Sequence, residues 1–183
     1  MKQVNNALFK PTLHIGAGKL KQIAWYYCNI LFLKSAWLPV SGFKAGLLSL
    51  FGAQIGKGVV IKPCVNIKYP WKLIVGDYCW IGENVWIDNL DQVRMDNSVT
   101  ISQGALLLTG NHNYKKESFD LITGPIHLEA GAWIGAKSMV GPGVTVGSHA
   151  VLSAGSIATR NLDAWGIYRG NPAELTGKRS ISE

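Results

Sequence analysis

Aliphatic residues recur at every sixth position along most of the chain. Two runs, separated by a short insertion, occupy Ile55, Ile61, Ile67, Val75, Ile81, Ile87, Val93, Val99 and Ala105. After a longer interruption the spacing continues at Leu128, Ile134, Val140, Val146, Leu152 and Ala158. An α-helix would scatter these side chains around its circumference, because its period is about 3.6 residues. Simple strand alternation does not impose a period of six either.

A six-residue unit is expected to form one short strand and one turn. Three such units close a triangular coil, in which each aliphatic side chain stacks on one in the coil below. The pattern therefore predicts an all-β solenoid, a parallel β-helix of hexapeptide repeats with about five coils. A β-sandwich would instead require turns about 8–12 residues apart, which the sequence lacks.

The repeat divides the chain into three parts. We predict an N-terminal extension over residues 1–52, a β-helix over residues 53–160 with an extended loop at 111–127, and a C-terminal tail over residues 161–183. The loop interrupts a regular wall, and functional residues tend to gather in such insertions.

The apolar run at residues 23–33 predicts a helix, followed by a shorter one after Pro39 and Gly42. The run is too short to span a bilayer, which needs about 20 residues, and it begins too far into the chain for a typical secretory signal. Two interpretations stay open. The helices could cap the end of the solenoid core, or Trp25, Tyr26, Tyr27 and Trp37 could lie at a membrane interface.

Composition narrows the function classes. Of the 183 residues 48% are hydrophobic and 16% charged, which excludes a mainly disordered chain. The net charge of +7 favours anionic partners such as phosphates, nucleotides, nucleic acid or membrane surfaces. The basic residues are scattered without a recognised nucleic-acid motif, so we do not expect nucleic acid. Cys28, Cys64 and Cys79 form no close pair, which favours a reducing cytosol.

Four segments resemble the hexapeptide-repeat O-acetyltransferases, and within them the colanic acid biosynthesis acetyltransferase group. They are residues 50–63, residues 101–114 with the motif TGNHNY, residues 133–162 with WIGAKSMVGPGVTVG, and residues 170–173 with GNPA. The apolar N-terminal segment is also similar to that of the group. The resemblance implies a left-handed coil, a homotrimer with its sites at subunit boundaries, and acetyl-CoA as the donor.

Transfer of an acetyl group to a hydroxyl requires a base that removes the hydroxyl proton, and histidine suits this role at neutral pH. The resemblance implies that His112 is this general base. Taken alone, a histidine in a loop is more often a solvated polar residue. His127 borders the loop and is a weaker candidate, His149 is interpreted as a structural turn residue, and His14 lies outside the repeat. Glu117, Asp120 or a backbone carbonyl could orient the base.

The resemblance also implies binding residues. Asp88 and Asn89, with Asn84 as a third candidate, are expected to bind the acceptor sugar, unless they are corner residues chosen for turn conformation. The residues expected to bind acetyl-CoA are Ala136, Ala154, Thr159, Arg160, Asn171, Lys178 and Arg179. The basic residues of the tail could instead be merely solvated. No metal-ligand spacing appears, so no metal is expected.

We therefore expect a cytoplasmic acetyl-CoA-dependent O-acetyltransferase that modifies a sugar hydroxyl in exopolysaccharide biosynthesis. A lipid-linked acceptor and peripheral contact with the inner membrane fit this expectation. A serine acetyltransferase or an N-acyltransferase for an amino sugar or nucleotide sugar is the alternative within enzymes. A non-catalytic or metal-binding β-helix is the alternative from another class.

Overall fold

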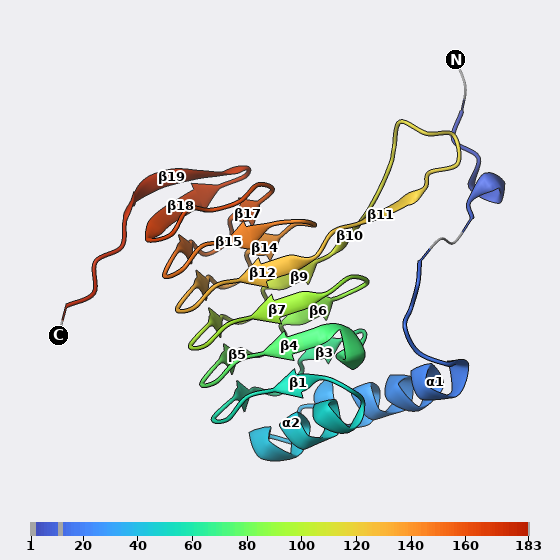
Figure 1. Cartoon of the computed structure of the whole chain (residues 1–183), viewed down its shortest axis with the longest axis horizontal. Helices are drawn as coiled ribbons and strands as arrows, with labels where there is room; N and C mark the ends of the chain where they lie inside the picture. Colours follow the sequence, from blue (N-terminus) through green and yellow to red (C-terminus); the bar gives the residue numbers. More distant parts are fainter. Residues whose placement is uncertain (1–2, 11–12, 183) are drawn as a thin grey trace.

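The computed structural model describes residues 3–10 and 13–182. The chain winds into a triangular prism whose three faces are sheets of stacked strands (Figure 1). Face 1 contains β1 (Gln54–Ile55), β4 (Leu73–Val75), β7 (Val93–Met95), β12 (Ile126–Leu128) and β15 (Thr145–Val146). Face 3 contains β3 (Asn66–Ile67), β6 (Trp86–Asp88), β9 (Leu106–Leu108), β14 (Met139–Val140) and β17 (Ile157–Ala158).

Face 2 is the longest of the three. It contains β2 (Val60–Ile61), β5 (Trp80–Ile81), β8 (Thr100–Ile101), β13 (Trp133–Ile134), β16 (Val151–Leu152), β18 (Gly166–Gly170) and β19 (Ala173–Lys178). All neighbouring strands of this face are parallel except β18 and β19, which pair antiparallel. The parallel β-helix predicted from the repeat is thus confirmed. Its five complete coils are followed by the start of a sixth, where Leu162 bridges to Val146.

The interior consists of aliphatic ladders that run along the prism. On face 2 the ladder residues are Ile61, Ile81, Ile101, Ile134 and Leu152, all essentially without solvent exposure. At the corners, small residues let successive turns approach closely. A Cβ atom on Gly135 would lie 2.5 Å from the backbone nitrogen of Ala154, so no side chain fits there.

The predicted six-residue phase is wrong between residues 88 and 107. Met95, not Val93, stacks on Val75, and likewise Ile101 and Leu107 continue the other two ladders. A second short extension after β6 shifts the phase by two residues. Val93, Val99 and Ala105 are nevertheless buried, because they occupy a second inward position; Val93, for example, lies opposite Leu73.

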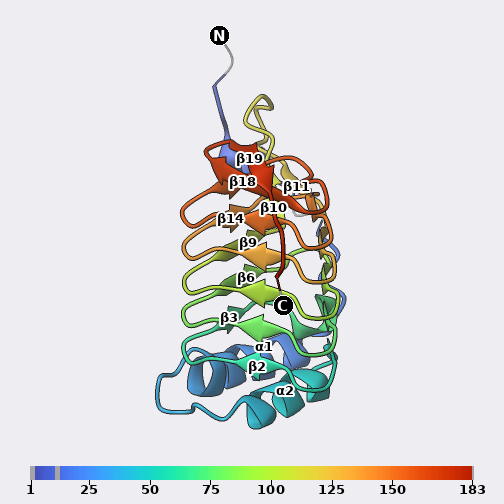
Figure 2. The same cartoon turned by 90° about the vertical axis from the view of Figure 1, so that its left-hand side faces the viewer.

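The N-terminal helices close one end of the prism (Figure 2). They are α1 (Lys19–Cys28), the π-helical η2 (Asn29–Leu33) and α2 (Ser41–Leu50). The Trp25 indole nitrogen donates to the Ile67 carbonyl at 2.9 Å, and Lys44 Nζ donates to the Lys62 carbonyl at 2.9 Å. Leu33 and Leu48 are fully buried against the core. The helices therefore form the cap that one interpretation of the sequence predicted.

Trp25 is only 2% exposed, so its assignment to a membrane interface is wrong, whereas Tyr26, Tyr27 and Trp37 are exposed. Within the described ranges, none of the helices combines the length and apolar character needed to cross a bilayer. Two short 3₁₀ turns, η1 (Asn6–Leu8) and η3 (Pro70–Lys72), complete the helical elements.

Shortening one ladder residue should destabilise the whole prism. Ile134→Ala leaves a cavity between Ile101 and Leu152, and we expect the free energy of unfolding to fall by about 2–5 kcal/mol in urea titrations. Thr100→Ala, at a half-buried outward position on the same face, is the matched control and should change it by less than about 1 kcal/mol. Equal effects of the two variants would contradict the ladder model.

Candidate active site

The interruption of the wall is a β-hairpin that leaves the corner between faces 3 and 1 (Figure 1). Its strands β10 (Gly110–His112) and β11 (Leu121–Thr123) pair antiparallel, with His112 opposite Leu121. Gly124 N donates to the Thr109 carbonyl at 2.9 Å and closes the hairpin at its root. The N-terminal segment lies alongside, where Asn5 N donates to the Glu117 carbonyl at 2.8 Å. The hairpin therefore holds His112 on paired strands rather than on a free loop.

Phe119 positions the His112 ring. The two rings stack with centroids 4.5 Å apart and planes 5° from parallel, and Phe9 lies on the same imidazole at 6.0 Å. His112 Nδ1 lies 2.8 Å from the Phe119 carbonyl oxygen. A carbonyl oxygen can only accept, so Nδ1 must carry the proton. In the neutral imidazole Nε2 therefore has a free lone pair and can act as a base.

A backbone carbonyl thus orients the His112 ring, one of the options that the sequence left open. Asp120 is engaged elsewhere in the hairpin, because its Oδ2 accepts from Lys116 Nζ at 2.9 Å. Hydrogen bonds from Ser118 and Lys116 hold the pKa of the Asp120 carboxyl below its usual range. This carboxylate is therefore ionised and satisfied at neutral pH without contacting His112.

Asp88 lies at the root of the hairpin, on the strand below. Its carbonyl accepts from Thr109 Oγ1 at 2.9 Å, and Thr109 Oγ1 in turn accepts from Asp91 N at 2.9 Å. The Asp88 side chain is 12% exposed, and its carboxylate pairs with Lys68 Nζ at 2.9 Å. The structure therefore ties Asp88 to the segment that carries His112, through a buried threonine.

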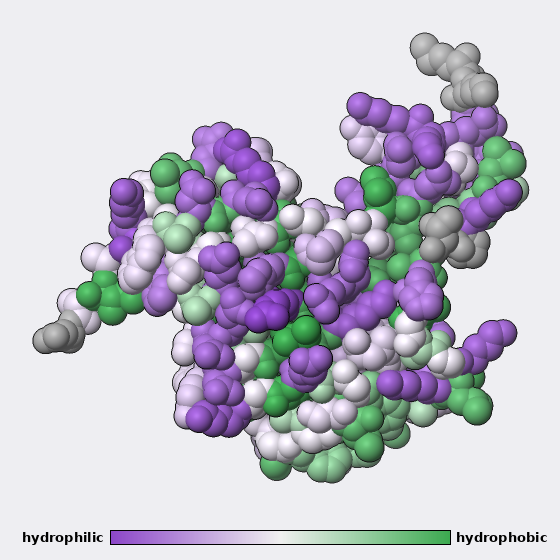
Figure 3. Space-filling model, viewed as in Figure 1, coloured by the Kyte–Doolittle hydropathy of each residue, from purple (hydrophilic) through white to green (hydrophobic). Residues whose placement is uncertain are grey.

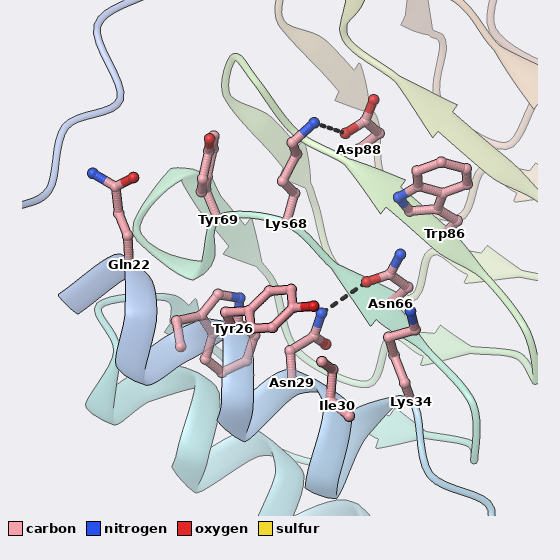
Figure 4. A pocket seen from close by; sticks show the side chains of 11 residues that line it. Gln22, Tyr26, Asn29, Ile30, Lys34, Asn66, Lys68, Tyr69, Trp86 and Asp88 are labelled. Atoms are coloured by element: carbon pink, nitrogen blue, oxygen red, sulfur yellow. Dashed lines mark hydrogen bonds and ion pairs between the residues drawn. The ribbon is translucent and has the colours of Figure 1, made fainter. Parts of the chain in front are cut away.

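Asp88 also borders a pocket of about 360 Å³ between α1, η2 and face 3 (Figure 4). The walls include the aromatic rings of Tyr26, Tyr69 and Trp86. Asn29 Nδ2 donates to Asn66 Oδ1 at 2.8 Å across the pocket floor. Aromatic faces together with amide and carboxylate groups are the features with which proteins bind small polar ligands.

The other two acceptor candidates differ from Asp88. Asn89 is fully buried, and both ends of its side chain bind the Tyr69 backbone: Oδ1 accepts at 2.9 Å and Nδ2 donates at 2.6 Å. Asn84 is exposed at the corner between β5 and β6, with a φ of 58°. That corner lies at the opposite end of β6 from Asp88. Both asparagines fit the alternative interpretation as corner residues.

A second hollow, of about 640 Å³, lies on face 3 beside the hairpin. Its lining includes Asn111, the neighbour of His112, together with Gly141, Pro142 and Thr159. Leu108 in this groove and Asp88 in the pocket below are register partners on adjacent strands. The two hollows therefore adjoin at the root of the hairpin. Arg160, the neighbour of Thr159, is exposed.

The remaining donor candidates are split between two other corners. Ala136 and Ala154 lie in successive coils at the corner between faces 2 and 3, joined by the bond from Gly155 N to the Ala136 carbonyl at 2.8 Å. Asn171 is near them, because the preceding Gly170 N donates to Ser156 Oγ. At the opposite edge of face 2, Lys178 pairs with Gly166 at the end of β19.

Arg179 is bound to backbone rather than free for a phosphate. Its guanidinium donates to the carbonyls of Gly131 and His149, at 3.0 and 3.3 Å. Both carbonyls belong to the corner between faces 1 and 2, so the structure does not bring Arg179 together with Ala136 and Ala154.

His149 and His127 are accounted for by local contacts. His149 stacks on Trp165 with centroids 4.3 Å apart and has a φ of 58°, which fits its interpretation as a turn residue. His127 Nε2 donates to Asp96 Oδ2 at 2.9 Å on the outside of face 1. Among the described residues, no group of three His, Cys, Asp or Glu side chains could hold a metal ion.

The comparisons with known proteins decide the family. Residues 125–160 match the model described as hexapeptide repeat of succinyl-transferase. The "Putative colanic acid biosynthesis acetyltransferase WcaF" of Escherichia coli (strain K12) is 37% identical over 170 residues, which cover 92% of both chains. The chain belongs to the hexapeptide-repeat acetyltransferase family. It is therefore an acyltransferase, in the group of this relative.

More distant relatives agree with this assignment. The galactoside O-acetyltransferase of E. coli K12 is 25% identical over 135 residues, 72% of this chain and 66% of that protein. A Vibrio cholerae hexapeptide-repeat acetyltransferase, solved with acetyl coenzyme A, superposes with a TM-score of 0.80 at 18% identity, over 89% of each chain. A galactoside acetyltransferase in complex with coenzyme A gives 0.76 at 21% identity, over 87% of this chain and 80% of that one. These superpositions confirm the fold.

Several residues of this candidate site were missed from the sequence. Phe119, Thr109 and Lys68 position His112 and Asp88, and Tyr26 reaches the pocket from α1. Only Thr109 carried a signal, since it belongs to the TGNHNY motif. The other three act through pairings that residue type and spacing do not reveal.

The Asp96 carboxylate should make the free energy of unfolding depend on pH. Burial raises the pKa of Asp96, but hydrogen bonds from Arg94 and His127 outweigh it, so this pKa lies below its usual range. A lowered carboxyl pKa stabilises the fold above the unfolded-state pKa of about 4, and the gain is lost as the pH falls through the folded-state value. Asp96→Asn should reduce the free energy of unfolding by about 1 kcal/mol at pH 7.

The measurement is urea unfolding of the wild type and Asp96→Asn from pH 7 to pH 2. The two curves should converge at the acid end, because the wild-type carboxylate is protonated there. Glu83→Gln, at an exposed corner position, is the control and should follow the wild type throughout. A constant difference between wild type and Asp96→Asn at every pH would refute the ionic contribution.

Proposed function

We propose that this acetyltransferase transfers the acetyl group of acetyl-CoA to a hydroxyl group of a sugar, with His112 as the general base. The observation that carries the proposal is the hydrogen bond from His112 Nδ1 to the Phe119 carbonyl, which leaves Nε2 unprotonated in the neutral ring. The names of the relatives support the acceptor class, since one is a galactoside O-acetyltransferase and another is assigned to colanic acid biosynthesis. The neighbour solved with acetyl coenzyme A supports the donor.

The transfer is direct, within a ternary complex. Nε2 takes the hydroxyl proton while the sugar oxygen bonds to the thioester carbonyl carbon. The tetrahedral intermediate then expels the sulfur of CoA, which receives the proton from the imidazolium. The Phe119 carbonyl stabilises the imidazolium, because its hydrogen bond from Nδ1 strengthens when the ring is charged.

The positions of the donor candidates favour a homotrimer with its sites at subunit boundaries. His112 rises from the corner between faces 3 and 1, whereas Ala136 and Ala154 lie at the corner between faces 2 and 3. One chain therefore presents the base and these alanines at opposite edges of face 3. In the proposed trimer, the hairpin of one subunit reaches the alanine corner of its neighbour, and acetyl-CoA lies in the crease between them.

The acceptor side of the proposal uses the pocket of Figure 4. Asp88 accepts hydrogen bonds from sugar hydroxyls, and Tyr26 and Trp86 provide apolar faces for the ring. The substrate is an exopolysaccharide precursor, in line with the relative assigned to colanic acid biosynthesis, whose alignment covers 92% of the chain. The proposal places the enzyme in the cytoplasm, because its three cysteines are free thiols.

Replacing the base tests the chemistry. His112→Ala should lower kcat by about 10²–10⁴-fold with acetyl-CoA and an acceptor sugar, because general-base assistance is lost. The dissociation constant of CoA, measured by calorimetry, should stay within about twofold because the ring is not assigned to CoA binding. His14→Ala, at an exposed position, is the control. Near-normal turnover of His112→Ala with CoA bound would end the proposal.

Asp88→Asn tests the acceptor pocket. The substitution should raise KM for the acceptor sugar about tenfold, because an amide makes a weaker hydrogen bond than a carboxylate. KM for acetyl-CoA should stay unchanged. A purely structural role would instead affect both KM values and the melting temperature. Lys68→Met, which removes the partner of Asp88, should reproduce part of the effect.

A panel of acceptors, with released CoA detected as free thiol, distinguishes the substrate classes. Turnover with hydroxyl sugars and their oligosaccharides is expected. Turnover restricted to amino sugars or to serine would contradict O-acetylation of a sugar and support one of the alternative acyl transfers.

A further inference from the structure

The outer side of the N-terminal helices is apolar. We call residues 19–50 the helical base, because they form one end of the prism. Ten of its large hydrophobic side chains are exposed: Leu20, Ile23, Tyr26, Tyr27, Ile30, Leu31, Trp37, Val40, Phe43 and Leu50. The space-filling view shows green side chains gathered along this end of the molecule (Figure 3). Such a concentration marks an interaction surface rather than the scattered exposure of an ordinary protein.

Helix geometry separates the outer side of the base from its inner side. Leu20, Ile23, Tyr27 and Leu31 follow the spacing of one helical face. The opposite face is bound to the prism through Trp25, which donates to the Ile67 carbonyl, and Asn29, which donates to Asn66 Oδ1. The cap of the core is complete without the outer stripe, so the stripe is free for a partner.

Charge is distributed unevenly along the chain. Residues 1–76 contain ten lysines and no aspartate or glutamate, a net charge of +10. The remaining residues contain eight basic and eleven acidic side chains, 8 − 11 = −3. On the helical base Lys19 and Lys34 are exposed near the apolar stripe, whereas the Lys21 ammonium lies 5.1 Å from the centre of the Trp71 ring. Eight of the ten lysines belong to residues 19–76, which form the helical base and the coil next to it, and only Lys44 among them is buried. The apolar end of the prism is therefore also positively charged.

We propose that the helical base docks on an anionic lipid surface. An exposed apolar stripe flanked by lysines, with tyrosine and tryptophan among its side chains, is the composition of helices that lie in a membrane interface. A second copy of the chain fits this surface less well, because contact between two helical bases would bring positively charged lysines together. The docking does not depend on the proposed reaction.

Docking would place the acceptor pocket beside the lipid. Tyr26 and Ile30 belong to the helical base and also line the pocket that contains Asp88 (Figure 4). The surface that contacts lipid and the pocket therefore share a wall. An acceptor attached to a membrane lipid could then enter the pocket without leaving the surface.

Co-sedimentation of the full-length protein with vesicles tests the proposal. We expect binding to vesicles of phosphatidylcholine with about 30% phosphatidylglycerol, whose anionic surface attracts the lysines. Binding to vesicles of phosphatidylcholine alone should be at least about tenfold weaker. Raising the salt concentration from about 0.1 to 0.5 M should weaken binding to the anionic vesicles about tenfold, because it screens the lysines.

The variant Leu20→Ser/Leu50→Ser removes two of the most exposed side chains, at 86% and 79% exposure. It should raise the lipid concentration for half-binding about tenfold, while turnover of a water-soluble acceptor stays unchanged. Leu175→Ser/Ile181→Ser, which changes two exposed residues of the C-terminal segment, is the matched control and should bind vesicles like the wild type.

Three results would overturn the proposal: no sedimentation with anionic vesicles, equal binding by both double variants, or a smaller particle mass of the Leu20→Ser/Leu50→Ser variant without lipid. The last result would show that the helical base mediates contact between two copies of the chain. Loss of activity in His112→Ala with normal vesicle binding would leave docking intact, so the two proposals fail independently.

Discussion

The stacking of aliphatic side chains from coil to coil is the constraint on which the structure depends. Between the end coils each ladder residue is covered above and below by another apolar side chain, as Ile134 is by Ile101 and Leu152, and the backbone of each coil hydrogen-bonds to its neighbours. A coil cannot shift without exposing apolar surface and breaking these bonds. The corners are therefore held at fixed positions, and a segment inserted at a corner starts from a rigid base.

The candidate active site uses that rigidity. Thr109, the last residue before the hairpin, is buried and bound to the Asp88 carbonyl, so the hairpin grows from an ordered corner. The hairpin strands then carry His112 to the stacked ring and carbonyl of Phe119. A base whose tautomer and plane are set before the substrate arrives needs no rearrangement during proton transfer.

The N-terminal helices meet two different requirements on their two sides. The inner side must satisfy an open end of the core, and it does so with Trp25, Leu33 and Leu48. The outer side has no such requirement, yet it retains apolar residues among lysines. A cap alone would need only the first pattern, and solvent would favour polar residues on the second side. The exposed stripe therefore points to a role beyond folding.

The sequence by itself determined the class of fold and the position of the interruption, because a period of six is compatible with a triangular coil and with little else. It also made His112 the candidate base, through the resemblance carried by the motif around it, and that role stays a prediction. The phase error after Ile87 shows the limit of this reasoning. Two inward positions lie two residues apart on each strand, and on this strand both take apolar residues, so spacing alone cannot tell Val93 from Met95.

Only the tertiary structure decided which polar side chains are free. Asn89 and Arg179 have the residue types expected of binding groups, but their side chains are bound to backbone from other coils. Asp88 and Phe119 acquire their importance from Lys68, Thr109 and the ring of His112. The partners of Asn89 and Arg179 come from other coils, 20 to 48 positions away and unrelated in residue type, so they emerge only when the coils are stacked.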